Sequence, residues 1–101
     1  MYVVEVFLPL ETGDGRRVGR RELEGLVTRL AEKFGGATAF TRSPALGLWK
    51  PGETIEKDQI IIVEVMVEEL DEAWWSNYRR HLEKQFEQDE ILIRATSCRK
   101  L

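Results

Sequence analysis

Three charged residues stand out because each lies inside a short segment that is otherwise apolar. These are Glu5, Glu64 and Arg94. A carboxylate held among apolar side chains takes a raised pKa and can act as a general acid or base. Beside an arginine, the same carboxylate forms a hydrogen-bonded ion pair, and Arg42 is a second cation that could take part. The residue types therefore predict either a structural ion-pair site or a catalytic pocket, and both interpretations remain open.

Other residues that could carry chemistry stand singly. His81, the only histidine, falls at the margin of an apolar helical stripe, as either a partly exposed side chain or a general base. Cys98, the only cysteine, lies beside two basic residues but can form neither an internal disulfide nor a multi-cysteine metal site. Trp49 has no place in the predicted core and could stack on a planar ligand. No metal ion or cofactor is expected.

A basic, glycine-containing stretch, residues 14–17, precedes the first predicted helix and is followed by Arg20 and Arg21. Such a position can hold an anion at a helix N-terminus. Its glycine spacing matches neither a P-loop nor a dinucleotide-binding fingerprint. The stretch is therefore interpreted either as an anion site or as a solvated turn.

Hydrophobic periodicity predicts four strands and two helices. A helix is expected over 20–34, because apolar residues recur there at helical spacing and Gly35 supplies a left-handed cap. A second helix should follow Asp71, a suitable N-cap, and carry Trp74 and Trp75 beside its apolar stripe. Strands are expected over residues 2–8, 37–42, 59–67 and 90–96.

The connection between the second and third strands, residues 43–57, is long for a compact domain. It contains Pro51-Gly52, a dipeptide typical of a β-turn, with apolar residues on both sides. We therefore expect an ordered hairpin arm over 46–55, packed by Trp49.

The order β-α-β-β-α-β is that of the ferredoxin-like fold, of the α+β class. Two right-handed β-α-β units give an antiparallel sheet with strand order 4-1-3-2 and both helices on one face. The first and third strands, which have the most regular apolar faces, then lie in the middle as burial requires. We expect one such domain over residues 1–101.

The sheet face that the helices leave open should be largely apolar. Burial of each such side chain is worth about 1.5–3 kcal/mol, so we expect two copies to associate through this face as a homodimer. The alternative is that the hairpin arm folds back over part of it. The face should present Val3, Phe7, Ile60, Ile62, Met66 and Leu92, together with Glu5, Glu64 and Arg94.

Composition and charge exclude several classes of partner. The net charge of −3 is too small to define an acidic or basic partner. Glu5 and Glu64 would repel phosphate, and Phe7 is the only aromatic side chain expected on the open face, so no nucleic-acid partner is expected. The longest aliphatic run, 60–63, is far too short to span a membrane, and no signal peptide is visible. A cytoplasmic location is expected.

Four short stretches of the sequence match a known type of protein, namely Val4–Pro9, Phe34–Phe40, Gly47–Trp49 and Ile91–Arg94. Through them the sequence resembles small bacterial proteins of the dimeric α+β barrel type. The resemblance implies a homodimer with a binding or structural role, in which sheet, arm and partner subunit can enclose a small ligand. Known barrel proteins include heme-degrading and quinone-forming monooxygenases, lactone isomerases and stress-response proteins, and their catalytic residues differ. The alternative implied function is a cofactor-independent monooxygenase or isomerase that uses Glu5, Glu64 or His81.

Overall fold

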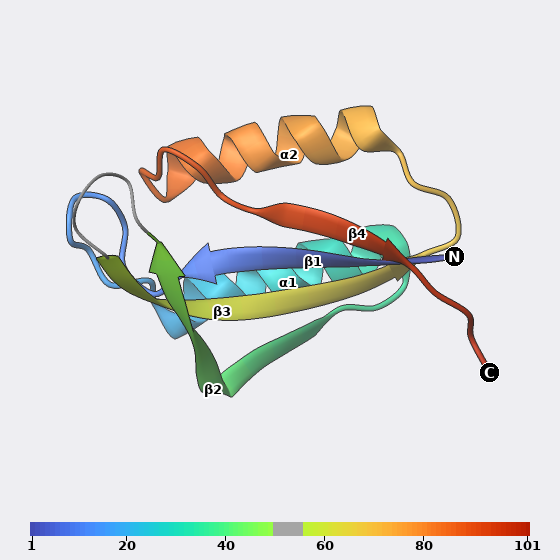
Figure 1. Ribbon diagram of the computed structural model, residues 1–101, viewed down its shortest axis with the longest axis horizontal. Coiled ribbons are helices and arrows are strands. Elements are labelled where there is room, and N and C mark those ends of the chain that lie inside the picture. The colour runs from blue at the N-terminus through green and yellow to red at the C-terminus, as the bar shows by residue number, and fades with distance from the viewer. Residues whose placement is uncertain (50–55) are drawn as a thin grey trace.

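Six elements follow one another in the order that periodicity predicts (Figure 1). The computed structural model describes the backbone of residues 1–49 and 56–101 and the side chains of residues 1–39 and 60–101. The elements are β1 (Tyr2–Pro9), α1 (Arg20–Phe34), β2 (Thr38–Trp49), β3 (Glu56–Val67), α2 (Glu72–Gln85) and β4 (Ile93–Ser97).

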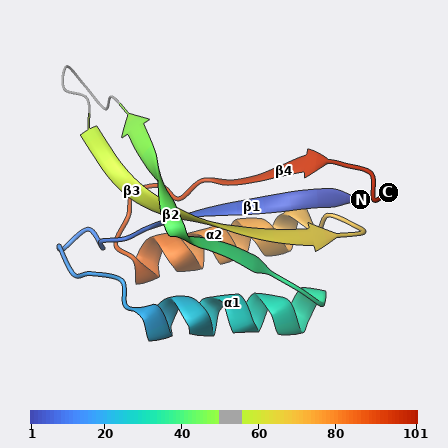
Figure 2. The same ribbon diagram turned by 90° about the horizontal axis from the view of Figure 1, so that it is seen from below.

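The strands form one antiparallel sheet in the order β2-β3-β1-β4. Along β1, pairing with β3 runs from Tyr2 opposite Val67 to Pro9 opposite Ile60. On its other edge, β1 pairs with β4. Both helices lie against the same face of the sheet (Figure 2). This is the ferredoxin-like α+β fold, and the strand order is the predicted one.

The core lies between the sheet and the helices, and strand alternation decides which side chains enter it. In the two central strands, every second residue is buried, because successive side chains point to opposite faces. The helices contribute one apolar stripe each. The buried side chains that these four elements contribute are Val4, Val6 and Leu8 of β1, Ile61, Val63, Val65 and Val67 of β3, Leu23, Leu26 and Leu30 of α1, and Trp75 and Leu82 of α2. Val18, Phe86 and Ile91, which lie outside the helices and strands, complete the buried apolar core of the described residues.

The predicted end of α1 and the predicted start of α2 are both confirmed by cap geometry. Gly35 takes a left-handed conformation with φ of 86°, and its N–H donates to the carbonyl oxygen of Ala31 at 2.8 Å. Asp71 caps the start of α2, where its side chain accepts a hydrogen bond from the N–H of Trp74 at 3.1 Å.

The second and third strands are longer than predicted. Pairing between β2 and β3 continues through most of the predicted connection, from Ala45 opposite Ile60 to Trp49 opposite Glu56. An irregularity separates this part from the pair of Phe40 and Ile62, and Pro44, which has no N–H for a ladder, lies within it. The predicted arm is thus the paired end of β2 and β3, and its tip, 50–55, lies outside the described residues.

The fourth strand begins later than the predicted 90–96. It starts at Ile93, because the N–H of Ile91 donates instead to the Glu83 carboxylate of α2 at 2.9 Å. The side chain of Ile91 is buried in the core. The segment before β4 is therefore held by α2 at Ile91 as well as by β1, where Leu92 accepts from the N–H of Phe7 at 3.0 Å.

The loop between β1 and α1 closes on itself and docks on the end of α2. The N–H of Thr12 donates to the carbonyl of Arg16 at 2.7 Å, and that of Val18 donates to Leu10 at 2.8 Å. The N–H of Gly13 donates to the carbonyl of Phe86 at 3.0 Å. A Cβ atom at residue 13 would lie 1.9 Å from the carbonyl oxygen of Glu87, so only glycine fits this contact.

Replacing Gly13 with alanine should therefore destabilise the protein by about 1–3 kcal/mol, because backbone must move to relieve the overlap. Gly19→Ala is the matched control, since a Cβ atom there meets nothing and its φ is −78°. The control should change stability by less than about 1 kcal/mol. Urea unfolding measures both, and equal midpoints for the two variants would contradict this prediction.

Candidate functional site

Three of the predicted site residues lie in a row across neighbouring strands. On β1, Glu5 is directly opposite Glu64 of β3 on one side and Arg94 of β4 on the other. The Nε atom of Arg94 donates to Oε1 of Glu5 at 2.8 Å. The guanidinium carbon of Arg94 also lies 5.0 Å from the centre of the Phe7 ring, within the range of a cation–π contact.

This row is only partly shielded from water. The side chain of Glu5 is 19% exposed and that of Arg94 is 57% exposed, and a pair this open contributes about 1 kcal/mol or less in one copy. Glu64, also half-buried, forms no ion pair with any described side chain. Two carboxylates directly opposite each other repel, which leaves a place for a further cation near Glu64.

Apolar side chains surround the row, as the sequence predicts for the open face. Val3, Phe7 and Ile62 are half-buried, whereas Met66 and Leu92 are 47% and 49% exposed. The paired ends of β2 and β3 rise away from the helices at one end of the sheet (Figure 2). The face is thus an apolar surface with one line of charge, bounded at one end by the arm.

The remaining predicted site residues are less well defined. Arg42 lies in the irregular part of β2, and Trp49 is opposite Glu56 in the arm, but the side chains of both lie outside the described residues. Their part in the site stays a prediction. His81 is exposed on α2, on the helix side of the sheet and away from Glu5. Cys98 is half-buried, and its N–H donates to the carbonyl of Met1 at 3.0 Å.

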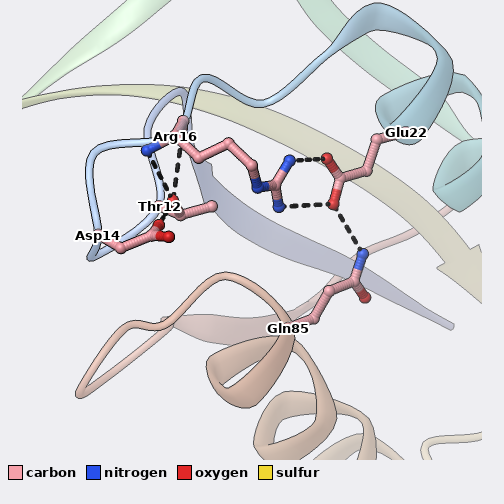
Figure 3. Close-up of polar contacts among 5 residues, drawn as sticks. All are labelled: Thr12, Asp14, Arg16, Glu22 and Gln85. Atoms are coloured by element: carbon pink, nitrogen blue, oxygen red, sulfur yellow. Dashed lines mark hydrogen bonds and ion pairs between the residues drawn. The ribbon is translucent and has the colours of Figure 1, made fainter.

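One cation of the basic stretch before α1, Arg16, forms an ion pair within the protein (Figure 3). The guanidinium of Arg16 binds both carboxylate oxygens of Glu22, at 2.9 and 3.3 Å, and Gln85 of α2 donates to the same carboxylate at 3.1 Å. Thr12 bonds to Asp14 and accepts from the N–H of Arg16. These contacts tie the loop to both helices and favour the interpretation as a structural turn.

Hydrogen bonds in this cluster lower the pKa values of two carboxyl groups. The bond from Thr12 lowers the pKa of Asp14 below its ordinary value. The bond from Arg16 lowers the pKa of Glu22, which also accepts from Gln85. Both carboxylates are therefore stabilised in their charged form.

Two features of the helix layer were not expected as sites. A groove of about 170 Å³ lies between α2 and β4, where the small side chains of Ser76 and Ala95 leave room. Small residues at these two positions were the only signal of it in the sequence. Its described lining residues are Val4, Leu70, Glu72, Trp75, Ser76, Arg79, Ile93, Arg94 and Ala95.

The second feature is an aromatic cluster where α1 ends beside the start of α2. Trp74 stacks on Tyr78 with ring centres 5.0 Å apart, and Phe34 stacks on Trp75 at 5.1 Å. Burial raises the pKa of Tyr78 to about 12, so this phenol stays neutral. The cluster packs the helices together, in agreement with the packing role that the sequence suggests for the two tryptophans.

Within the described part of the chain, no group of three or more His, Cys, Asp or Glu side chains is placed to hold a metal ion. No helix among the same residues is long and apolar enough to cross a membrane.

The ion pair in the loop cluster should make stability depend on pH. Because the pKa of Glu22 is lower in the folded than in the unfolded state, its contribution is complete above the ordinary pKa of a glutamate, about 4.3. That contribution is lost as the pH falls through the lowered value. Glu22→Gln should thus cost about 1 kcal/mol or less near neutral pH and nothing once the pH is below that lowered value.

Urea unfolding from pH 7 to pH 3 measures this difference. Glu24→Gln is the matched control, because its pair with Arg20 is far more exposed and should contribute little at any pH. A Glu22→Gln penalty that stayed constant down to pH 3 would show that the ion pair is not its cause.

Comparison with known proteins supports the fold. No family model matches the sequence, and no curated protein matches it. The chain is similar to a phage SAM lyase in complex with S-methyl-5'-thioadenosine, with TM-score 0.64 and 11% identity over 95% of this chain and 80% of that chain. It is also similar to CutA1 from Pyrococcus horikoshii OT3, with TM-score 0.60 and 14% identity over 100% of this chain and 86% of that chain. At such identities the likeness shows a shared ferredoxin-like fold.

Proposed function

We propose that the protein is a homodimer joined through its open sheet face, with a binding or structural role. The single observation that carries this proposal is the apolar character of that face, with Met66 and Leu92 about half exposed in one copy. Contiguous apolar patches of this kind usually mark an interaction surface. Covering these side chains with a second copy would contribute roughly 25 cal/mol for each Å² of apolar surface buried.

The row of charged residues on the open face can form ion pairs with the same row of a second copy. Arg94, Glu5 and Glu64 lie in this order across three neighbouring strands. A two-fold axis parallel to the strands, passing over Glu5, would reverse that order in the facing copy. Each Arg94 would then face Glu64 of the other copy, which supplies the cation that Glu64 lacks among the described side chains.

A small ligand can be accommodated in the same arrangement. The raised ends of β2 and β3 bound the open face at one end, where Trp49 lies on β2. A ligand would be held between sheet, arm and the second copy, in an apolar site with few polar groups. The cytoplasmic location remains a prediction that belongs to this proposal.

A catalytic function is the second candidate, favoured by the placement of two carboxylate residues, Glu5 and Glu64, directly opposite each other on one apolar face. Two neighbouring carboxyl groups can serve as general acid and general base. The proposed activity is that of a cofactor-independent monooxygenase or isomerase acting on a small molecule. A phage SAM lyase with the same fold was solved with a small nucleoside bound, so the fold is compatible with such ligands.

Dimerisation through the open face can be tested at one of its exposed apolar residues. Met66→Lys should halve the mass of the particle, because it would bury an unpaired charge in the open-face interface, yet the half-exposed side chain adds no strain within one copy. Ala73→Lys adds the same charge at an exposed position of α2, on the helix side, and should leave the mass unchanged. Sedimentation equilibrium at micromolar concentration decides the question, and a monomeric wild-type protein would refute the proposal.

The ion-pair row gives an independent measure of burial in the dimer. Arg94→Leu should weaken dimerisation by roughly 3–5 kcal/mol if the interface closes over the row, because it leaves buried carboxylates without a cation. The dissociation constant, measured by dilution, reports this change. A loss below about 1 kcal/mol would mean that the row stays in water and that the open face is not the interface.

A further inference from the structure

β4 is the last strand of the sheet, and its outer edge is paired with no strand among the described residues. All of its residues from Arg94 to Ser97 are exposed, including Ala95 on the helix side. Exposed edges of this kind are sites where another strand can add. We propose that two copies of the chain join edge to edge through β4, and that the segment 98–101 of each copy adds beside β4 of the other.

The hydrogen bonds of β4 show which backbone groups are free for such pairing. Leu92 accepts from the N–H of Phe7, and the N–H of Cys98 donates to Met1, both toward β1. In an antiparallel pair, alternate residues turn their backbone groups to opposite edges. The N–H and C=O groups of Ile93, Ala95 and Ser97 therefore face outward, and the incoming strand must hydrogen-bond to these three residues.

The groove between α2 and β4 accepts a side chain from the added strand. Ile93 and Ala95 lie opposite Val6 and Val4, so their side chains are on the helix side and line the groove. The groove has an apolar floor that includes Trp75, and Glu72 and Arg79 of α2 are among its polar lining residues. Main-chain pairing along an edge, with pockets for alternate side chains, is a recurring mode of strand addition.

The residues that follow β4 match this groove in polarity. Leu101 is fully exposed, and Arg99 and Lys100 are also exposed. The groove reaches the first turn of α2 and the loop before it, since Glu72 and Leu70 are among its lining residues, and this loop and turn carry several exposed carboxylates. These are Glu68, Glu69, Asp71 and Glu72. A basic segment that ends in leucine complements both the acidic end and the apolar floor.

One register satisfies every one of these constraints. With Ser97 of the two copies opposite each other, Arg99 lies opposite Ala95 and Leu101 opposite Ile93. All of these residues have outward backbone groups, if the alternation of β4 continues. Arg99 is then beside Glu72, and Leu101 is on the apolar floor next to Trp75. Lys100 falls on the other face, opposite Arg94, where the two like charges repel and only this pair opposes the contact. The contact is two-fold symmetric, so each of these interactions occurs twice.

This contact is separate from the one proposed for the open face, because it uses the edge of the sheet and the helix side of β4. If both contacts form, a particle contains at least four copies. If only the edge contact forms, it contains two. The mass of a variant that lacks the edge contact therefore tests the two proposals separately.

Two charge reversals in the same short segment form the central test. Arg99→Glu should weaken the edge contact about tenfold or more, because it places a carboxylate beside Glu72 twice in each edge contact. Lys100→Glu makes the same change in net charge but should weaken nothing, since its side chain faces Arg94. Sedimentation velocity over a dilution series measures both. Equal weakening by the two variants, or none by either, would overturn the proposed register.

Leu101→Asp removes the apolar anchor without affecting the fold, because this side chain contacts nothing in one copy. It should halve the mass of the wild-type particle. Two copies remain if the open face also associates, and one copy remains if it does not. A mass that is the same as that of the wild type would overturn the edge contact and leave the open-face proposal standing.

Amide hydrogen exchange gives a second measurement at the level of single residues. The amides of Ala95 and Ser97 should exchange slowly at high protein concentration and rapidly in Leu101→Asp. Those of Arg94 and Thr96, which face β1, should be protected in both proteins. Rapid exchange at Ala95 and Ser97 in the associated wild-type protein would show that another surface joins the copies.

Discussion

The pairing of β1 with a strand on each side determines how the rest of the molecule is arranged. Because side chains alternate with a period of two, the register of this one strand assigns Val4 and Val6 to the core and Glu5 to the open face. A slip by one residue would bury Glu5 and expose both valines. The same register places the neighbouring charges of β3 and β4 on the face that carries Glu5.

Two helices on one side of four strands leave two kinds of surface incompletely covered. One is the open face, which keeps half-exposed apolar side chains such as Met66 and Leu92. The other is the strip along β4, where α2 leaves Ala95 exposed and a groove beside it. Both surfaces result from the same geometry, since the helices pack over the centre of the sheet and the chain has no further described element to cover its edge. These are the two surfaces at which we propose that copies of the chain associate.

Charged side chains are paired to different extents in the loop before α1 and on the open face of the sheet. At the loop before α1, Arg16 is held by Glu22, and Gln85 supports the same carboxylate, so this ion pair is complete within one copy. On the open face, Glu5 has Arg94, whereas Glu64 has no ion-pair partner among the described side chains. Arg16, one cation of the stretch that could have bound an anion, therefore has a structural role. A pair of strand carboxylates remains the better candidate for a binding surface.

Local pattern by itself determined the element order, the helix caps and the assignment of residues to the two sheet faces, because periodicity and cap chemistry depend on neighbours in the chain. The extent of β2 and β3 depended on tertiary structure, since pairing resumes beyond Pro44 only when the partner strand is in place. The same holds for the contact between Glu22 and Gln85, which are far apart in sequence. Which backbone groups of β4 face outward was likewise decided by its pairing with β1, because hydrogen-bond direction is a property of two strands together.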